Sequence, residues 1–269
     1  MSEHGEGTFQ NGEATIYEQW WQPEGEARAV VAICHGYAEH GGRYSQVAAD
    51  LNARGFAVEA LDLRGHGRSS GERVTVKDYD EWIGDLATFV ERARGRNPGK
   101  KLFLLGHSMG GGVSVSYLLA RKPALDGVIL SGAGLLGPRP APPPEGSSQA
   151  APQPLPAATI SRDPAVVAAY ENDPLVYRGP RPAGMAAVSK AAYEMVQRDM
   201  HTIAYPLLLL HGTEDLLVAA KGSEILYERA ASPDKTLKLY PGLYHEVLNE
   251  PERDQVVGDV VEWLEARTS

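Results

Sequence analysis

The stretch that decides the fold is residues 102–120, LFLLGHSMGGGVSVSYLLA. It begins with an apolar run at 102–105, passes through a glycine-rich turn and continues as a second apolar run at 113–120. That order predicts a buried strand that turns sharply into a helix. The turn, GHSMG at 106–110, matches G-x-S-x-G, the pattern that holds a serine hydroxyl exposed at a sheet edge. We therefore predict that Ser108 is a nucleophile rather than a serine that only caps the helix.

A second match to the same pattern, GRSSG at 67–71, lacks this setting. Polar residues flank it on both sides, so neither a buried strand nor an apolar helix is predicted beside its serines. The strand-to-helix turn needs both elements, with glycines that let them approach closely. We interpret the second match as a coincidence in a polar loop.

Apolar runs recur along the chain and predict further strands that are buried on both faces. Helical patterns separate several of these runs. Strands that alternate with helices indicate the α/β class, with a mostly parallel central sheet and helices on both of its faces. The predicted strands are residues 29–34, 56–63, 102–105, 128–130, 207–210 and 237–240.

Two local patterns are more specific. An Asn-Gly pair at 11–12 precedes the run at 14–21 and predicts a type I′ β-hairpin. Residues 77–94 carry apolar side chains at three- and four-residue spacing, which predicts an amphipathic helix. The acidic residues expected on its solvent face are Asp80, Glu81, Asp85 and Glu91.

One long segment, residues 137–204, interrupts the alternation of strands and helices. We interpret it as a cap, or lid, inserted between a first core part, 1–136, and a second core part, 205–269. Within it, eight of the nineteen residues at 138–156 are proline, which excludes a helix or a central strand and predicts a mobile or polyproline-like connector. Residues 163–200 are predicted to be helical again.

A serine hydroxyl becomes a strong nucleophile when a base takes its proton and a carboxylate orients that base. Asp215 and His245 each follow a predicted strand of the sheet. The carboxyl ends of parallel strands share one edge, so both side chains are expected beside Ser108. We predict a triad of these three residues and prefer Asp215 to Glu214 for its position after the strand. His211 is expected to be a hydrogen-bonded core residue.

Ester hydrolysis also needs hydrogen-bond donors for the negatively charged oxygen of the tetrahedral intermediate. One is expected from the backbone N–H of Met109, which follows the nucleophile, and the other from the loop after the early strand, where we assign the N–H of Tyr37. His35 is expected to brace this loop. The single cysteine, Cys34, closes a predicted buried strand and is expected to be an inert core thiol.

Five motifs together resemble those of the monoacylglycerol lipases and related lysophospholipases of the α/β-hydrolase superfamily. The resemblance covers about 28–131 and 160–266. It implies an α/β-hydrolase fold and a serine hydrolase that cleaves monoacylglycerols to glycerol and fatty acid through an acyl-enzyme. The motifs are HGYAEH at 35–40 with Arg43-Tyr44, DLRGHGRS at 62–69, GHSMGG at 106–111, HGTED at 211–215 and YPGLYHE at 240–246.

The resemblance further implies that Glu39, Arg43 and Tyr170 lie around the glycerol end of the substrate. A site built to hydrogen-bond hydroxyls would discriminate against substrates that lack them. Each residue has a simpler alternative: Glu39 and Arg43 pair only with each other, and Tyr170 is a packing residue of its helix.

The sequence of the predicted cap differs from the usual pattern of this family. Its relatives usually carry an apolar cap helix that docks on membranes and lines an acyl tunnel, whereas this chain has the proline-rich residues 138–156. We therefore expect at most weak peripheral membrane contact through the cap and a wider tunnel mouth.

The composition of the chain limits the classes of partner that the protein is expected to bind. The chain of 269 residues carries 26 Lys and Arg against 35 Asp and Glu, a net charge of −9, which disfavours binding to nucleic acid. We see no signal peptide or membrane-spanning stretch and expect a cytoplasmic protein. The motifs of metal and nucleotide sites are missing, so no metal and no cofactor are expected. The partner expected is a small lipid ester, and a homodimer stays open.

Other functions remain compatible with the sequence. A broader carboxylesterase or lysophospholipase would use the same residues, and acyl transfer to an alcohol would differ only in the second nucleophile. A non-catalytic binding protein with the α/β-hydrolase fold is the alternative from another class, because a fold does not fix a function.

Overall fold

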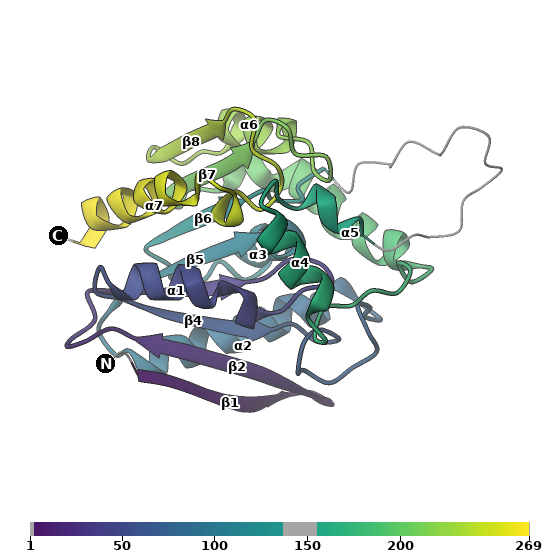
Figure 1. Cartoon of the computed structure of the whole chain (residues 1–269), viewed down its shortest axis with the longest axis horizontal. Coiled ribbons are helices and arrows are strands. Elements are labelled where there is room, and N and C mark those ends of the chain that lie inside the picture. Colours follow the sequence, from purple (N-terminus) through teal and green to yellow (C-terminus); the bar gives the residue numbers. More distant parts are fainter. Residues whose placement is uncertain (1–2, 137–154, 269) are drawn as a thin grey trace.

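A single eight-stranded sheet runs through the centre of the protein (Figure 1). The computed structural model describes residues 3–136 and 155–268. The strands are β1 (Glu3–Asn11), β2 (Ala14–Gln22), β3 (Ala29–Cys34), β4 (Phe56–Asp62), β5 (Lys101–His107), β6 (Gly127–Ser131), β7 (Leu207–Gly212) and β8 (Lys235–Tyr240). The α-helices are α1 (Ser45–Asn52), α2 (Tyr79–Arg96), α3 (Ser108–Arg121), α4 (Pro164–Asn172), α5 (Met185–Asp199), α6 (Lys221–Arg229) and α7 (Arg253–Thr268).

The order and direction of the strands decide which of the following segments meet at one edge of the sheet. It is β1-β2-β4-β3-β5-β6-β7-β8, with antiparallel pairs at β1–β2 and β2–β4 and parallel pairs from β4 to β8. The mostly parallel sheet and its predicted strands are confirmed. Since β3, β5, β7 and β8 run in one direction, the segments that follow them emerge at the same edge.

Burial on both faces explains why the strands appear as continuous apolar runs. In β3, Val31 and Ile33 pack into a core with α1 and α7, while Val30 and Ala32 pack into a second core with α2 and α3. Successive side chains of a strand point to opposite faces, so a strand covered by helices on both sides must be apolar at every position.

The N-terminal hairpin is confirmed, but its predicted turn type is wrong. Asn11 pairs with Ala14, which leaves Gly12 and Glu13 as a two-residue turn. A type I′ turn needs positive φ at both central residues, whereas only Gly12 has it, with φ of 60°. Positive φ at the first central residue alone is the feature of a type II′ turn, for which glycine is preferred there.

The predicted solvent exposure of Asp85 is also wrong, although the amphipathic helix itself is confirmed as α2. Asp85 is fully buried and accepts hydrogen bonds from the Arg64 guanidinium and from Asn11 Nδ2 at 2.7 Å. Arg64 follows β4 and is partly buried, so the carboxylate has a cationic partner from another segment of the chain. Asp80 and Glu91 are exposed as expected.

Between β6 and β7, the described residues form two helices rather than one helical stretch. Asp163 begins α4 by accepting a hydrogen bond from Ala165 N at 2.8 Å, at the predicted start. Residues 173–184 then separate α4 from α5 and include three prolines, which lack the amide that a helix needs. In Figure 1, α4 and α5 are both drawn beside the end of the sheet where α3 starts. The predicted mobility of 138–156 falls almost wholly outside the described residues.

Two glycine substitutions should have opposite effects on stability. A Cβ at Gly110 would lie 2.2 Å from His35 O and 2.3 Å from Cys34 O, whereas nothing lies within 4 Å of a Cβ at Gly258 in α7. We expect Gly110→Ala to lower the free energy of unfolding by about 2 kcal/mol or more, because the helix must move away from the sheet. Gly258→Ala should raise it by about 0.5–1 kcal/mol. Urea denaturation measures both, and a Gly110→Ala protein as stable as the parent would contradict the close contact.

Candidate active site

The predicted sharp turn from strand to helix is present at Ser108. The strand β5 ends at His107, α3 begins at the next residue, and Ser108 has φ of 51°, in the left-handed region. The turn depends on glycine, since a Cβ at Gly106 would lie 2.5 Å from Ser114 Oγ and 2.9 Å from Gly110 O. The glycine spacing of the motif therefore reflects how closely α3 packs against the sheet.

The structure brings the three predicted triad residues together. Ser108 Oγ lies 2.8 Å from His245 Nε2, and His245 Nδ1 lies 2.7 Å from Asp215 Oδ2. Asp215 follows β7 and His245 follows β8, so the parallel strands deliver them to the edge where α3 starts. Asp215 is buried, whereas the neighbouring Glu214 is exposed, which agrees with the choice between the two acids.

The electrostatics of the pair suit a base and its orienting carboxylate. Burial by itself would raise the pKa of Asp215, but the charge and hydrogen bond of His245, together with a hydrogen bond from His211, hold it well below its ordinary value. Burial would likewise lower the pKa of His245, yet Asp215, Glu246 and Glu39 raise it above its ordinary 6.5. An ionised Asp215 therefore favours a proton on His245 when Ser108 loses its own.

Two further histidines, His107 and His211, lie beside the triad. Burial, with His245 nearby, lowers the pKa of His107 to about 4, and its ring lies 4.8 Å from that of His245. His211 is fully buried, with Nδ1 at 2.8 Å from Ser223 Oγ and Nε2 at 3.1 Å from Asp215 Oδ2, so it is the hydrogen-bonded core residue that was predicted.

The loop after β3 is held against Ser108 by its own side chains. His35 Nδ1 donates to Gly36 O at 2.7 Å, and its Nε2 accepts from Leu63 N at 2.9 Å, so His35 braces the loop as expected. Gly36 N donates to Glu39 Oε1 at 2.6 Å. A Cβ at Gly36 would lie 3.1 Å from the Ser108 Cβ, which places the loop directly beside Ser108.

The predicted oxyanion donors, the Tyr37 and Met109 amides, flank this point. Tyr37 follows Gly36 in the loop. Met109 is the second residue of α3, and the first amides of a helix have no carbonyl partner within the helix. Cys34, at the end of β3, is fully buried, and burial raises the pKa of its thiol, in keeping with an inert core residue.

Arg43 joins the loop after β3 to the loop after β8. Its Nη1 lies 2.6 Å from Glu39 Oε2 and 2.7 Å from Glu246 Oε1, and its Nη2 lies 2.7 Å from Glu246 Oε2. The pairing of Glu39 with Arg43, one of the alternatives left open by the sequence, is therefore present. The sequence patterns assign no role to Glu246, although it directly follows His245.

Tyr170 covers this cluster from α4. Its ring centroid lies 4.8 Å from Arg43 Cζ, and the side chain is buried, which raises the pKa of the phenol. The Tyr170 hydroxyl is buried without a hydrogen-bond partner among the described residues. Such an atom is costly unless a ligand or a water molecule satisfies it.

The described residues offer neither a metal-binding cluster nor a membrane-spanning helix. Across residues 3–136 and 155–268, no group of three or more His, Cys, Asp and Glu side chains is placed to hold a metal ion. Within the same residues, no helix is both long and apolar enough to cross a membrane.

Known proteins are similar to this chain in both amino-acid sequence and fold. A family profile described as serine aminopeptidase S33 (Hydrolase_4) matches residues 25–252. Monoacylglycerol lipase of Mycolicibacterium smegmatis is 41% identical over 94% of this chain and 94% of its own length. The chain belongs to the monoacylglycerol lipase family of α/β-hydrolases.

Solved structures of this family agree with the fold. Monoacylglycerol lipase of Paleococcus ferrophilus superposes with a TM-score of 0.79 at 30% identity, over 94% of this chain and 99% of the other. A soluble variant of the Saccharomyces cerevisiae monoglyceride lipase, in complex with a substrate analogue, gives 0.80 at 25% identity, over 98% and 95%. As in this family, the protein is a carboxylic ester hydrolase with the α/β-hydrolase fold.

The left-handed backbone at Ser108 should be measurable as strain. An L-residue in this region costs about 1–2 kcal/mol, and glycine avoids that cost. We expect Ser108→Gly to be more stable than Ser108→Ala by about 1 kcal/mol, since both lack the hydroxyl and only alanine keeps the strained Cβ. Thermal and urea unfolding of the two variants measure the difference. Equal stabilities would contradict the strain.

Proposed function

We propose that this protein hydrolyses monoacylglycerols to glycerol and fatty acid, with Ser108, His245 and Asp215 as its catalytic residues. The observation that carries the proposal is the continuous hydrogen-bonded row from Ser108 Oγ through His245 to Asp215, with distances of 2.8 and 2.7 Å. The name and 41% identity of the mycobacterial monoacylglycerol lipase support the substrate class.

The row supports a two-stage reaction. Ser108 Oγ attacks the ester carbonyl while His245 Nε2 takes its proton, and the same proton then passes to the glycerol oxygen as the ester bond breaks. A water molecule next attacks the acyl-enzyme, with His245 again taking the proton and returning it to Ser108, and a fatty acid leaves. Asp215 keeps His245 in the required tautomer and stabilises its charged form.

The Tyr37 and Met109 amides are our proposed donors to the tetrahedral oxyanion. Glu39 supports this role because it accepts the neighbouring Gly36 N–H at 2.6 Å and is fixed in turn by Arg43. The loop therefore holds its shape before substrate arrives. Preorganised donors stabilise the developing charge without reorganising during the reaction.

On the glycerol side, the three proposed residues have different roles. Glu39 and Arg43 are engaged with each other and with Glu246, so they shape the wall of the site. Tyr170 alone of the three has a buried polar atom without a partner among the described residues. We propose that the Tyr170 hydroxyl binds a free hydroxyl of the glycerol moiety.

We also infer that residues 137–204 form a cap on a core of residues 1–136 and 205–269. The strands β6 and β7 are parallel neighbours in the sheet although the intervening segment separates them in sequence. A cytoplasmic location, weak peripheral membrane contact and a homodimer remain predictions.

Removing the nucleophile tests the reaction itself. Ser108→Ala should lower hydrolysis of a short monoacylglycerol by about four orders of magnitude or more, because no oxygen is left to form the acyl-enzyme. Ser45→Ala, at an exposed serine of α1, is the matched control and should keep full activity. Glycerol release measures both. Turnover by Ser108→Ala near that of the parent would refute the proposal.

The pH dependence of the rate tests the state of His245. The neutral form is the base, and the pKa of His245 is raised above 6.5, so kcat/KM should fall as pH falls through a midpoint above 6.5. Glu246→Gln removes one negative charge that raises this pKa, so the midpoint should move to lower pH. Glu262→Gln, at an exposed site on α7, should leave it in place. A midpoint that moves upward in Glu246→Gln would contradict this assignment.

Hydrolysis of a substrate panel separates the proposed activity from its neighbours. Rates on monoacylglycerol should exceed those on triacylglycerol, which has no free glycerol hydroxyl, since a site with a hydroxyl-binding Tyr170 discriminates against substrates without that hydroxyl. Lysophospholipid keeps one free hydroxyl, so its rate relative to monoacylglycerol tests the lysophospholipase alternative separately. Tyr170→Phe should reduce this preference by raising KM for monoacylglycerol while leaving simple esters of the same acyl chain unaffected. Equal loss on both substrate types would indicate a packing role instead.

A further inference from the structure

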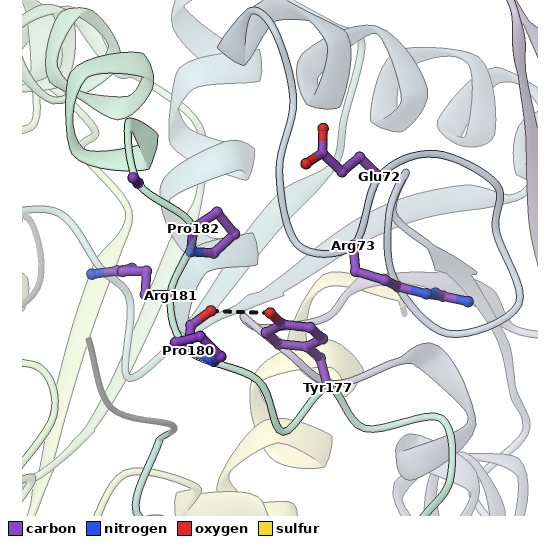
Figure 2. Close-up of a pocket in the computed structure, with 7 residues that line it drawn as sticks. Glu72, Arg73, Tyr177, Pro180, Arg181 and Pro182 are labelled. Atoms are coloured by element: carbon purple, nitrogen blue, oxygen red, sulfur yellow. Dashed lines mark hydrogen bonds between the residues drawn. The ribbon is translucent and has the colours of Figure 1, made fainter. Parts of the chain in front are cut away.

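Two adjoining pockets lie outside the triad, where the segment between α4 and α5 crosses the loops that follow β3 and β4. The first, of about 540 Å³, is lined by residues that include Glu72, Arg73, Tyr177, Arg181 and Pro182 (Figure 2). The second, of about 290 Å³, shares Arg73 and Tyr177 with the first and adds Arg178 to the wall. We call these two pockets together the arginine groove.

The groove gathers arginines whose charge is not neutralised. Among the described residues, Arg73, Arg178 and Arg181 form no ion pair with a carboxylate, and the only other arginines of which this is true are Arg54 and Arg229. The chain has a net charge of −9, so such a concentration of unpaired cations at one place is unexpected on composition alone. It would attract an anion that the rest of the surface repels.

The three guanidinium groups are held by neutral partners. Arg73 Nη1 donates to Gly67 O at 2.9 Å, Arg178 donates to the carbonyl of Glu171, and Arg181 Cζ lies 5.1 Å from the centroid of the Tyr37 ring. These contacts leave several N–H donors of each group unused and do not cancel its charge.

The acidic residues of the groove are Asp173 and Glu72. Asp173 is already engaged, since its Oδ2 lies 2.8 Å from His40 Nε2 and its Oδ1 accepts from Leu175 N. In Figure 2 the Glu72 side chain extends away from that of Arg73, so the carboxylate does not cover the guanidinium. His66, in the wall of the second pocket, adds no charge near neutral pH because burial lowers its pKa to about 4.

The remaining walls of the groove are apolar. Tyr177 lies between Arg73 and Arg181, its hydroxyl donates to Pro180 O at 3.0 Å, and Pro182 continues the wall (Figure 2). Tyr177 is itself fixed to the loop after β3, since its backbone N–H donates to Ala38 O at 2.8 Å. A preformed groove with apolar walls and a few cationic groups suits an amphiphilic anion.

The groove begins beside the proposed reaction centre. Arg181 lies on Tyr37, and the adjacent Gly36 is the residue whose Cβ would lie 3.1 Å from the Ser108 Cβ. Ester hydrolysis turns a neutral substrate into a carboxylate at this place. The product therefore carries a charge that the substrate lacks, and it has an acyl chain that apolar walls would accommodate.

We propose that the arginine groove binds the carboxylate of the fatty acid that ester hydrolysis releases. This inference rests on the proposed function for the identity of its ligand. A planar membrane surface would not need a concave site with apolar walls, which favours a single amphiphilic molecule over a lipid bilayer.

The experiment measures binding without turnover. Octanoate and its neutral analogue octanamide are titrated into the full chain carrying Ser108→Ala, at pH 7.5 and low salt, by isothermal titration calorimetry. Octanoate should bind more tightly than octanamide, and added salt should weaken only octanoate. Arg73→Gln and Arg178→Gln should each weaken octanoate binding about two- to fivefold and leave octanamide unchanged.

Two further variants test whether octanoate affinity depends on charge within the groove and not on charge elsewhere in the protein. Glu72→Gln should strengthen octanoate binding, because it removes the unpaired negative charge of the groove. Arg229→Gln, which removes the same charge from α6 outside the groove, should have no effect.

Several outcomes would overturn the proposal. These are octanoate affinity unchanged in the Arg73→Gln and Arg178→Gln variants, octanamide binding as tightly as octanoate, and inorganic phosphate displacing octanoate at equal concentration, which would indicate a general anion site. Loss of binding to vesicles of anionic phospholipid in these variants, without loss of octanoate binding, would assign the groove to membranes instead. Failure of monoacylglycerol hydrolysis by the parent enzyme is a separate result, which would refute the proposed function.

Discussion

The close approach of α3 to the central sheet is the constraint on which the rest of the site depends. Ser108 adopts a left-handed backbone between β5 and α3. Glycine at 110 leaves room for the carbonyl groups of Cys34 and His35, and glycine at 106 leaves room for Ser114 Oγ. Because the helix starts at the serine itself, its first amides stay free of helical partners at the place where negative charge would develop. A strained turn therefore places both the proposed nucleophile, Ser108, and a proposed oxyanion donor, the Met109 amide, at the start of α3.

Ion pairs then fix the positions of the loops after β3 and β8 relative to that turn. Arg43 binds Glu39, which fixes the loop after β3, and Glu246, which follows His245. Breaking a buried pair by removing one partner is expensive, so these two loops are held together as a unit. The base and the proposed oxyanion loop thus share one positioning group, although they are about 200 positions apart in sequence. Three of the five described arginines that form no ion pair with a carboxylate, Arg73, Arg178 and Arg181, line a groove beside the site.

Two kinds of feature explain where the sequence patterns mislead: contacts between distant segments, and prolines that interrupt a helical pattern. Asp85 occupies a helix position that periodicity assigns to solvent, but Arg64 from another loop covers it. Helical pattern continues through 163–200, yet prolines between 174 and 182 divide it into α4 and α5. Glu246 carries no local pattern of its own, so its partnership with Arg43 could not be inferred from spacing. In each case a partner far away in the sequence, or a single imino acid, outweighs the local pattern.

The sequence by itself determined the fold class, the strands, the strand-to-helix turn and the three residues that meet at its edge. Those features follow from local chemistry: apolar runs for strands buried on both faces, glycine where backbones touch, and acid and histidine placed directly after parallel strands. The tertiary structure alone decided that the Tyr170 hydroxyl has no partner among the described residues, that Arg43 joins two loops and that three arginines share a groove. Such properties depend on distances between side chains from different elements, which chain folding fixes and sequence spacing does not.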